Sequence, residues 1–89
     1  MHQIIYTQKA RQDLKSLDYQ IHSRIIKKIH EYSLTDNPLS FAKRLQNSPL
    51  GTYRFRIGDY RAIFDLDENN NIKILLILTI GHRKEIYDD

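Results

Sequence analysis

The 89-residue sequence contains no cysteine and no apolar run long enough to cross a membrane as a helix. Without cysteine, the chain has no disulfide framework, no thiolate nucleophile and no cysteine-ligated zinc site. The N-terminal segment has only a brief apolar run before charged residues begin, so we expect neither a signal peptide nor a membrane anchor. We therefore expect a protein of the reducing cytoplasm.

The sequence also lacks the short motifs of metal and nucleotide sites. Its four histidines do not have the spacing of metal ligands, and His30-Glu31 has no second histidine to complete a zinc motif. There is no glycine-rich phosphate loop and no nucleophile elbow. We expect neither a metal ion nor a small-molecule cofactor.

The residues that are present have the composition of an ordinary folded domain, with 40% apolar and 28% charged residues. We expect residues 1–89 to form one domain. A domain of this size has one modest core, so any ligand site must lie at the surface or in a shallow groove. The net charge of +3 is only a mild bias towards anionic partners, so the position of each charge matters more than the total.

The first half of the chain predicts a strand followed by two helices. Residues 3–7 are β-branched and aromatic, as in a strand. The next segment, with Thr7 as N-cap, has a helical apolar stripe of Ala10, Leu14 and Leu17. After Asp18, a second helix has an apolar face of Ile21, Ile25, Ile29 and Tyr32. The short connection favours a helical hairpin, Pro38 ends the second helix, and residues 39–46 are expected to add another helical turn.

The second half of the chain predicts three antiparallel strands. From Tyr53 the apolar period changes to two, and Gly58-Asp59 suits a type II′ turn into the next strand. A looser turn at residues 67–71 precedes residues 72–80, whose nearly continuous apolar run indicates a strand covered on both faces. The predicted fold is α+β, in the order β-α-α-β-β-β. Its four-stranded, mostly antiparallel sheet has the helical hairpin on one face, and the other face is open.

The arginines of YRFRIGDYRAIF, residues 53–64, are the main functional signal. A two-residue loop places Arg56 directly opposite Arg61, with Arg54 on the same side of the sheet. Opposed like charges cost about 0.2–1 kcal/mol of stability. A surface selected for stability alone would therefore not have an arginine opposite Arg56. Either the three side chains point into water and pair with nearby aspartates, or they form a clamp for phosphate groups, for which planar guanidinium groups are well suited.

The C-terminal segment adds further groups of the same kind. Gly81 allows a sharp turn after the last strand, and His82 is an imidazole, the side chain that changes charge near neutral pH. Arg83 and Lys84 are cationic, and Tyr87 is an aromatic that can stack on a base. Taken singly, His82 is more often an ordinary surface histidine, and Tyr87 more often a ring packed on the sheet. Their closeness to the arginines makes a site plausible.

The order of elements, together with the sequences YRFRIGDYRAIF and GHRKEIYD, resembles the RelE branch of the RelE/ParE toxin superfamily. These proteins are the toxic halves of type II toxin–antitoxin pairs, and the resemblance covers essentially the whole chain. It implies a ribosome-dependent endoribonuclease that cuts mRNA in the ribosomal A site without a metal ion. The 2′-hydroxyl attacks the adjacent phosphate, which gives a 2′,3′-cyclic phosphate and a 5′-hydroxyl, while cationic side chains stabilise the added charge.

The resemblance also implies roles for individual residues. Arg54 and Arg56 match the basic pair on the first hairpin strand, and Arg61 matches the phosphate-binding arginine after the turn. Arg83 matches the C-terminal arginine, and Tyr87 matches the tyrosine that stacks on the base. The expected RNA-binding groups are Arg54, Arg56, Arg61, Arg83, Lys84 and Tyr87.

The chain departs from the superfamily pattern at the proposed general base. Relatives have lysines at the positions of Arg54 and Arg56, and one of those lysines is proposed to remove a proton. A guanidinium keeps its proton at neutral pH, so it stabilises negative charge well and removes a proton poorly. We therefore expect the arginines to clamp the phosphate and His82 to act as general acid or base.

Two other activities are open on the same fold. ParE-type toxins inhibit DNA gyrase through protein contacts and need no nuclease site, and a catalytically weak relative would bind an antitoxin or RNA without cutting it. For the nuclease, the expected partners are the ribosome with A-site mRNA and an acidic, RelB-like antitoxin. The open face of the sheet, or the groove beside the helical hairpin, would receive the antitoxin.

Overall fold

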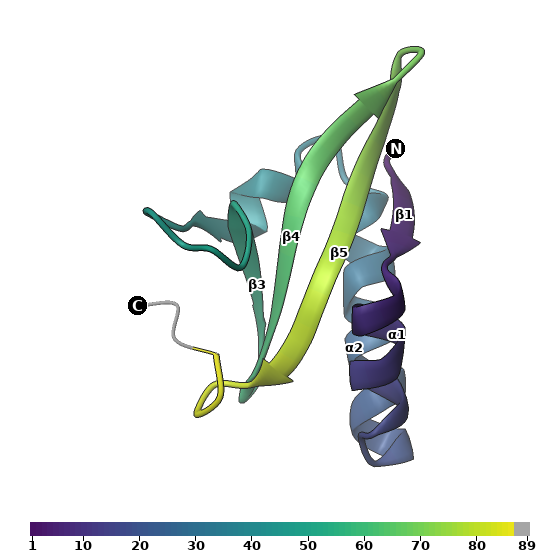
Figure 1. The fold of residues 1–89 in the computed structure, drawn as a ribbon. Coiled ribbons are helices and arrows are strands. Elements are labelled where there is room, and N and C mark those ends of the chain that lie inside the picture. The colour runs from purple at the N-terminus through teal and green to yellow at the C-terminus, as the bar shows by residue number, and fades with distance from the viewer. Residues whose placement is uncertain (87–89) are drawn as a thin grey trace.

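The computed structural model of the chain describes residues 1–86. These residues form an α+β fold in which α1 and α2 lie together on one side of a sheet (Figure 1). The elements in chain order are β1 (Gln3–Tyr6), α1 (Gln8–Lys15), α2 (Tyr19–Ser33), the 3₁₀ helix η1 (Pro38–Phe41), β2 (Ala42–Arg44), β3 (Tyr53–Ile57), β4 (Tyr60–Asn69) and β5 (Ile72–His82).

Within residues 1–86 the sheet has five strands in the order β1-β5-β4-β3-β2, not the four that the sequence predicted. β1 runs parallel to β5, and the other neighbours are antiparallel. The added strand, β2, lies in the segment expected to form a helical turn. Only the first part of that segment is helical, because η1 ends at Phe41 and the next three residues pair with residues 53–55. Leu45, whose spacing from Phe41 suggested a helix, instead packs against Ile63.

The two α-helices are held on the sheet by their apolar stripes. They run antiparallel, as predicted (Figure 1), and the Thr7 hydroxyl accepts a hydrogen bond from the Ala10 backbone N–H at 3.1 Å, which caps α1. Asp18 occupies the N-cap position of α2 without a capping hydrogen bond from its side chain. No helix of the described residues is long and apolar enough to span a membrane. The helix residues buried in the core are Ala10, Leu14, Ile25 and Ile29.

The β3–β4 hairpin has the predicted register, with Arg56 opposite Arg61. Gly58 has a φ of 60°, the left-handed value that glycine adopts without strain at the first position of a type II′ turn. The turn between β4 and β5 is tighter than predicted, because Asn70 and Asn71 alone connect the paired ends of the strands. Their φ angles of 51° and 68° are those of a type I′ hairpin turn.

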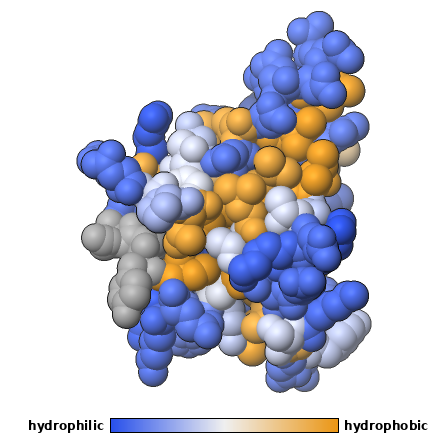
Figure 2. All heavy atoms as spheres, in the orientation of Figure 1, coloured by the Kyte–Doolittle hydropathy of each residue, from blue (hydrophilic) through white to orange (hydrophobic). Residues whose placement is uncertain are grey.

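The sheet face opposite the helices is only partly open. Leu45, Ile63 and Ile86 form a small buried cluster on it, separate from the main core. The sequence predicted that β5 is covered on both faces. The helix side is covered, with Leu75 fully buried, and the other face is covered in part, since Ile74 is 8% exposed and Leu76 is half-exposed. Figure 2 shows apolar surface along β4 and β5 on this side of the molecule, bordered by polar side chains.

Candidate functional site

The site begins with cations on the sheet face opposite the helices. The register places Arg54, Arg56 and Arg61 together on this face, as predicted. Arg56 is exposed, Arg54 is half-buried, and Lys43 on β2 pairs directly with Arg54 and adds an exposed ammonium group. Four cationic side chains therefore share one corner of the sheet, which favours an anionic ligand there.

Arg61 differs from the other three because it is buried, with only 6% of its surface exposed. Its Nη1 donates hydrogen bonds to the backbone carbonyls of Gly58 and Tyr60, both at 3.1 Å. The sequence predicted three side chains that emerge from the sheet, either into water or towards a phosphate. Instead, Arg61 supports the β3–β4 turn from within, and its charge is fixed in place next to Arg56.

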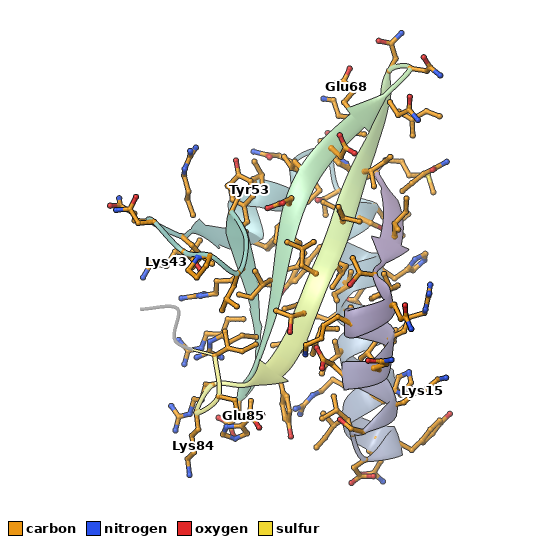
Figure 3. The ribbon with its side chains drawn as sticks, in the orientation of Figure 1. Lys15, Lys43, Tyr53, Glu68, Lys84 and Glu85 are labelled. Atoms are coloured by element: carbon orange, nitrogen blue, oxygen red, sulfur yellow. The ribbon has the colours of Figure 1, made fainter. Side chains whose placement is uncertain are left out.

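A tight turn after β5 brings the C-terminal groups to the same end of the sheet (Figure 3). The backbone N–H groups of Glu85 and Ile86 donate to the carbonyl of His82, at 2.7 and 3.1 Å. The backbone N–H of Arg83 donates to the carbonyl of Asp59 in the β3–β4 turn at 2.7 Å. Arg83 Nε also lies 3.7 Å from the Asp59 carboxylate. His82 and Arg83 are thus tied directly to the arginine hairpin.

The hydrogen bond to His82 fixes which ring nitrogen is available. Nδ1 accepts from the backbone N–H of Lys84 at 3.1 Å, and the ring contacts Tyr60 edge-on with centroids 5.3 Å apart. A nitrogen that accepts a hydrogen bond has no proton, so the neutral ring has its proton on Nε2. In this arrangement His82 offers a hydrogen-bond donor at Nε2.

Asp13 on α1 fixes the end of β5 from which this turn starts. One carboxylate oxygen accepts from the Thr79 hydroxyl at 2.8 Å and from the Ile80 backbone N–H at 2.9 Å, and the other lies 2.6 Å from Lys9 Nζ. Burial alone would raise the pKa of Asp13, but these donors hold its pKa below the ordinary value. The helix layer is thereby joined to the strand that leads to His82.

Sequence comparison assigns the chain to a family with this arrangement of elements. The family model described as the ParE toxin of type II toxin–antitoxin systems, parDE, matches residues 4–87. Toxin RelG of Mycobacterium tuberculosis is 32% identical over 85 residues, which cover 92% of this chain and 91% of RelG. The chain belongs to the RelE/ParE toxin superfamily. It is therefore a toxin of the type II toxin–antitoxin class.

Solved structures resemble the toxin over nearly its whole length. The toxin–antitoxin complex RelBE2 of Mycobacterium tuberculosis contains a chain that is 27% identical, with a TM-score of 0.66 over 92% of this chain and 98% of that one. An archaeal RelE–RelB complex from Pyrococcus horikoshii contains a chain with a TM-score of 0.68 at 23% identity, over 96% of this chain and 98% of that one. The second likeness concerns the fold alone.

Most predicted site residues of the toxin lie in two neighbouring groups. Arg54, Arg56 and Arg61 are on the hairpin, while His82 and Arg83 are on the turn tied to it by Asp59; Lys84, in the same turn, is exposed. Tyr87 lies outside the described residues.

Three residues of the site were missed from the sequence. Lys43 was assigned to a helical turn, so its pairing with Arg54 was not foreseen. Arg24 on α2 was not singled out from the sequence; it is exposed, and its guanidinium lies against the hairpin turn, since a Cβ built on Gly58 would be 3.0 Å from Arg24 Nη2. Asp59 was considered only as a partner for the hairpin arginines, and it binds Arg83 instead. The positive charges of Arg24 and Lys43 were the feature of the sequence that could have pointed to these two residues.

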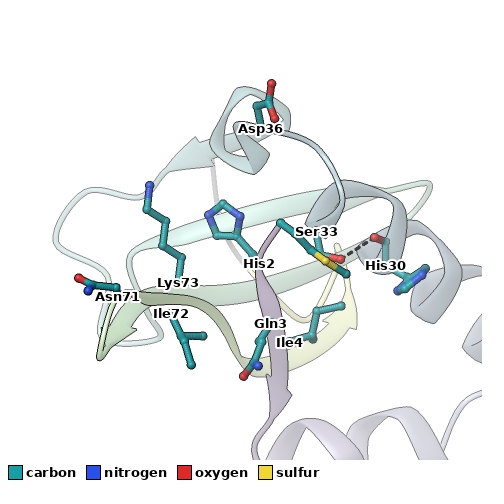
Figure 4. Close-up of a pocket in the computed structure, with 10 residues that line it drawn as sticks. His2, Gln3, Ile4, His30, Ser33, Asp36, Asn71, Ile72 and Lys73 are labelled. Atoms are coloured by element: carbon teal, nitrogen blue, oxygen red, sulfur yellow. Dashed lines mark hydrogen bonds between the residues drawn. The ribbon is translucent and has the colours of Figure 1, made fainter.

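A hollow of about 780 Å³ lies at the opposite end of β5 and contains none of the predicted site residues (Figure 4). Its wall includes His2, which is only 8% exposed. Burial lowers the pKa of His2, and the N-terminal amine and Lys73 lower it further. Within residues 1–86, histidine and acidic side chains form no group of three or more that could hold a metal ion.

Proposed function

We propose that this toxin is a metal-independent endoribonuclease that cleaves mRNA in the ribosomal A site by attack of the 2′-hydroxyl on the adjacent phosphate. The observation that carries the proposal is the direct pairing of Arg56 with Arg61, beside Arg54 and Lys43, on the sheet face without helices. Like charges in this arrangement repel one another. A phosphate bound among them would relieve that repulsion, which supports an RNA backbone as the ligand.

The cations suit the charge that develops during cleavage. A phosphorane carries more negative charge than the phosphate from which it forms, and donors fixed in advance stabilise it most effectively. Arg61 is fixed by the turn carbonyls, while Arg56 and Arg83 are exposed and able to present paired N–H groups to phosphoryl oxygens. We assign phosphate binding to these three arginines together with Arg54.

His82 is the proposed general acid or base, because imidazole exchanges a proton near neutral pH and guanidinium groups do not. In the structure its Nδ1 already accepts a hydrogen bond from Lys84. A proton can reach Nδ1 only when that contact opens. The proposal therefore includes a local change at Lys84 when RNA binds.

The partner that we propose for the toxin is an acidic, RelB-like antitoxin. The chain has a net charge of +3, and four cations cluster on one sheet face, so an acidic segment is attracted to it. The solved relative from Mycobacterium tuberculosis is the toxin–antitoxin complex RelBE2, which supports this kind of partner. An antitoxin over the cations would keep RNA away from them.

The first test of the nuclease is cleavage of a defined mRNA on programmed ribosomes, mapped by primer extension. Arg56→Ala removes an exposed guanidinium without disturbing the turn that Arg61 supports. We expect the cleavage rate to fall about 100- to 1,000-fold, as when one preorganised donor is lost. Lys15→Ala, a control that removes an exposed cation from α1, should stay within about twofold of the wild type. An Arg56→Ala toxin that cuts as fast as the wild type would contradict the proposed site.

A gyrase inhibitor of the ParE type is the second candidate. It is favoured by the matching family model, which describes ParE toxins, and by the burial of Arg61, which gives one of the four cations a structural task. A supercoiling assay with DNA gyrase distinguishes the two. Intact mRNA together with inhibited supercoiling would place the toxin with ParE, and A-site cuts with unaffected gyrase would place it with RelE.

A further inference from the structure

Ile86 is the last described residue, and its side chain is buried although it lies beyond the last strand. Only 6% of its surface is exposed, and it packs with Leu45 and Ile63. Ile63 is fully buried and belongs to β4, whereas Leu45 follows β2. One apolar side chain therefore joins the C-terminal turn to two other segments on the face that carries the cations.

Two glycines make room for this contact. A Cβ built on Gly81 would lie 3.0 Å from Ile86 Cδ1 and 3.2 Å from its Cγ1, so a larger residue at 81 would push Ile86 away. A Cβ on Gly51 would lie 2.7 Å from Ile63 Cγ2, so the loop after Leu45 approaches β4 equally closely. The backbone therefore packs closely against Ile86 at Gly81 and against its partner Ile63 at Gly51.

The side-chain tethers of the turn are weak by comparison. The Arg83–Asp59 ion pair spans 3.7 Å between side chains that are 55% and 67% exposed, where water screens the attraction. The hydrogen bond from the His82 N–H to the Glu85 carboxylate is long, at 3.3 Å, and exposed. Among residues 1–86, the turn is also held by the strand pairing of His82 with Tyr60 and by the backbone bond from Arg83 to Asp59. Beyond these, the buried contact of Ile86 is what fixes the described part of the turn on the sheet.

We propose that Ile86 is a positioning residue of the toxin, which fixes His82 and Arg83 against the cationic face without touching RNA itself. The inference rests on the proposed nuclease function. Because a displacement of about 1 Å from productive geometry can cost about 100-fold in rate, loosening this anchor reduces cleavage even though every cation is still present. The loss falls mainly on kcat, because Arg54 and Arg56 still bind the RNA.

The test compares four variants in the ribosome cleavage assay. Ile86→Ala and Leu45→Ala remove opposite halves of the contact, and Ile86→Leu restores its volume. Ile72→Ala is the control, since Ile72 is 44% exposed at the far end of β5. We expect the two anchor truncations to lower kcat about 10- to 100-fold with little change in KM, Ile86→Leu to recover most of it, and Ile72→Ala to match the wild type.

Hydrogen exchange, measured on the same proteins, separates positioning from general loss of stability. Ile86→Ala should speed exchange at the amides of Arg83, Glu85 and Ile86 about tenfold or more, while the β4–β5 amides keep their protection. Unchanged kcat, unchanged exchange in the turn, or an equal loss of protection throughout the sheet would each overturn the proposal. If the wild type does not cut mRNA, the nuclease function fails on its own, and the exchange measurement still decides whether Ile86 holds the turn.

Discussion

At the scale of single residues, His82 offers the sharpest test of mechanism. Its Nδ1 accepts from Lys84, so the ring either donates from Nε2 or gives up that contact and carries a proton. We expect general acid–base catalysis, so His82→Ala and His82→Gln should both lose about 100- to 10,000-fold in single-turnover cleavage. If His82→Gln, which can still donate from its amide, retains more than about a tenth of the rate, the ring acts only as a hydrogen-bond donor.

The side chains of the hairpin show how far a residue's role follows from sequence. A two-residue turn with glycine first fixes the register, so the shared face of Arg54, Arg56 and Arg61 was predictable. The burial of Arg61 was not, because it depends on carbonyls of the turn that a linear pattern does not place near a guanidinium. The link between Arg83 and Asp59 also depends on two turns that meet only in the folded chain.

At the scale of elements, hydrogen bonds to the Asp13 carboxylate connect α1 to β5. Asp13→Ala leaves the Thr79 hydroxyl and the Ile80 N–H without their acceptor, so we expect a loss of about 1–3 kcal/mol in the free energy of unfolding from urea titration. Lys9→Ala removes only a partly exposed ion pair and should cost less than about 1 kcal/mol. Equal losses in the two variants would contradict the assignment.

The contribution of Asp13 to the free energy of unfolding depends on pH. The folded state holds the pKa of Asp13 below its ordinary value of 3.8, so the contribution is fully present above that pH. It is lost as the pH falls through the lowered value in the folded protein. The difference in unfolding free energy between wild type and Asp13→Ala should therefore shrink only at pH values below about 4.

The patterned elements were predicted from the sequence, and the three-residue strand β2 was not. The apolar stripes of α1 and α2 could be recognised in the sequence, as could the alternation of apolar and polar residues in β3. Each pattern repeats at least twice along its element. β2 has three residues, too few to show a period, and it is a strand only because β3 lies beside it. Its omission also hid Lys43, so one missed strand removed one cation from the predicted site.

At the scale of the whole molecule, the burial of His2, just before β1, makes stability depend on pH. Burial lowers the pKa of His2 from 6.5, so the unfolded chain binds a proton more readily than the folded one. The contribution of His2 is complete above about pH 6.5 and declines as the pH falls from there through the lowered folded value. The ionisable side chains around the hollow beside it are His30, Asp36 and Lys73. Asp67 and Glu68 line a second hollow that His2 also borders.

Urea midpoints measured on both sides of pH 6.5 test this dependence. The wild type should lose more stability on acidification than His2→Gln, which has no imidazole to protonate. Parallel pH profiles for the two proteins would show that His2 is not the source. Ile72→Ala serves again as the control, since it changes no titrating group.

The parallel pairing of β1 with β5 has a consequence for how the protein is made. The Thr7 hydroxyl donates to the carbonyl of Leu78, 71 positions later, and within residues 1–86 β1 forms its ladder only with β5. During synthesis, β1 and both α-helices leave the ribosome long before the strand on which they pack. Closing so long a loop is entropically costly and slow compared with local folding. Under the proposed function, the toxin would therefore complete its fold only after β5 has left the ribosome, so the ribosome that translates it would not be its first target.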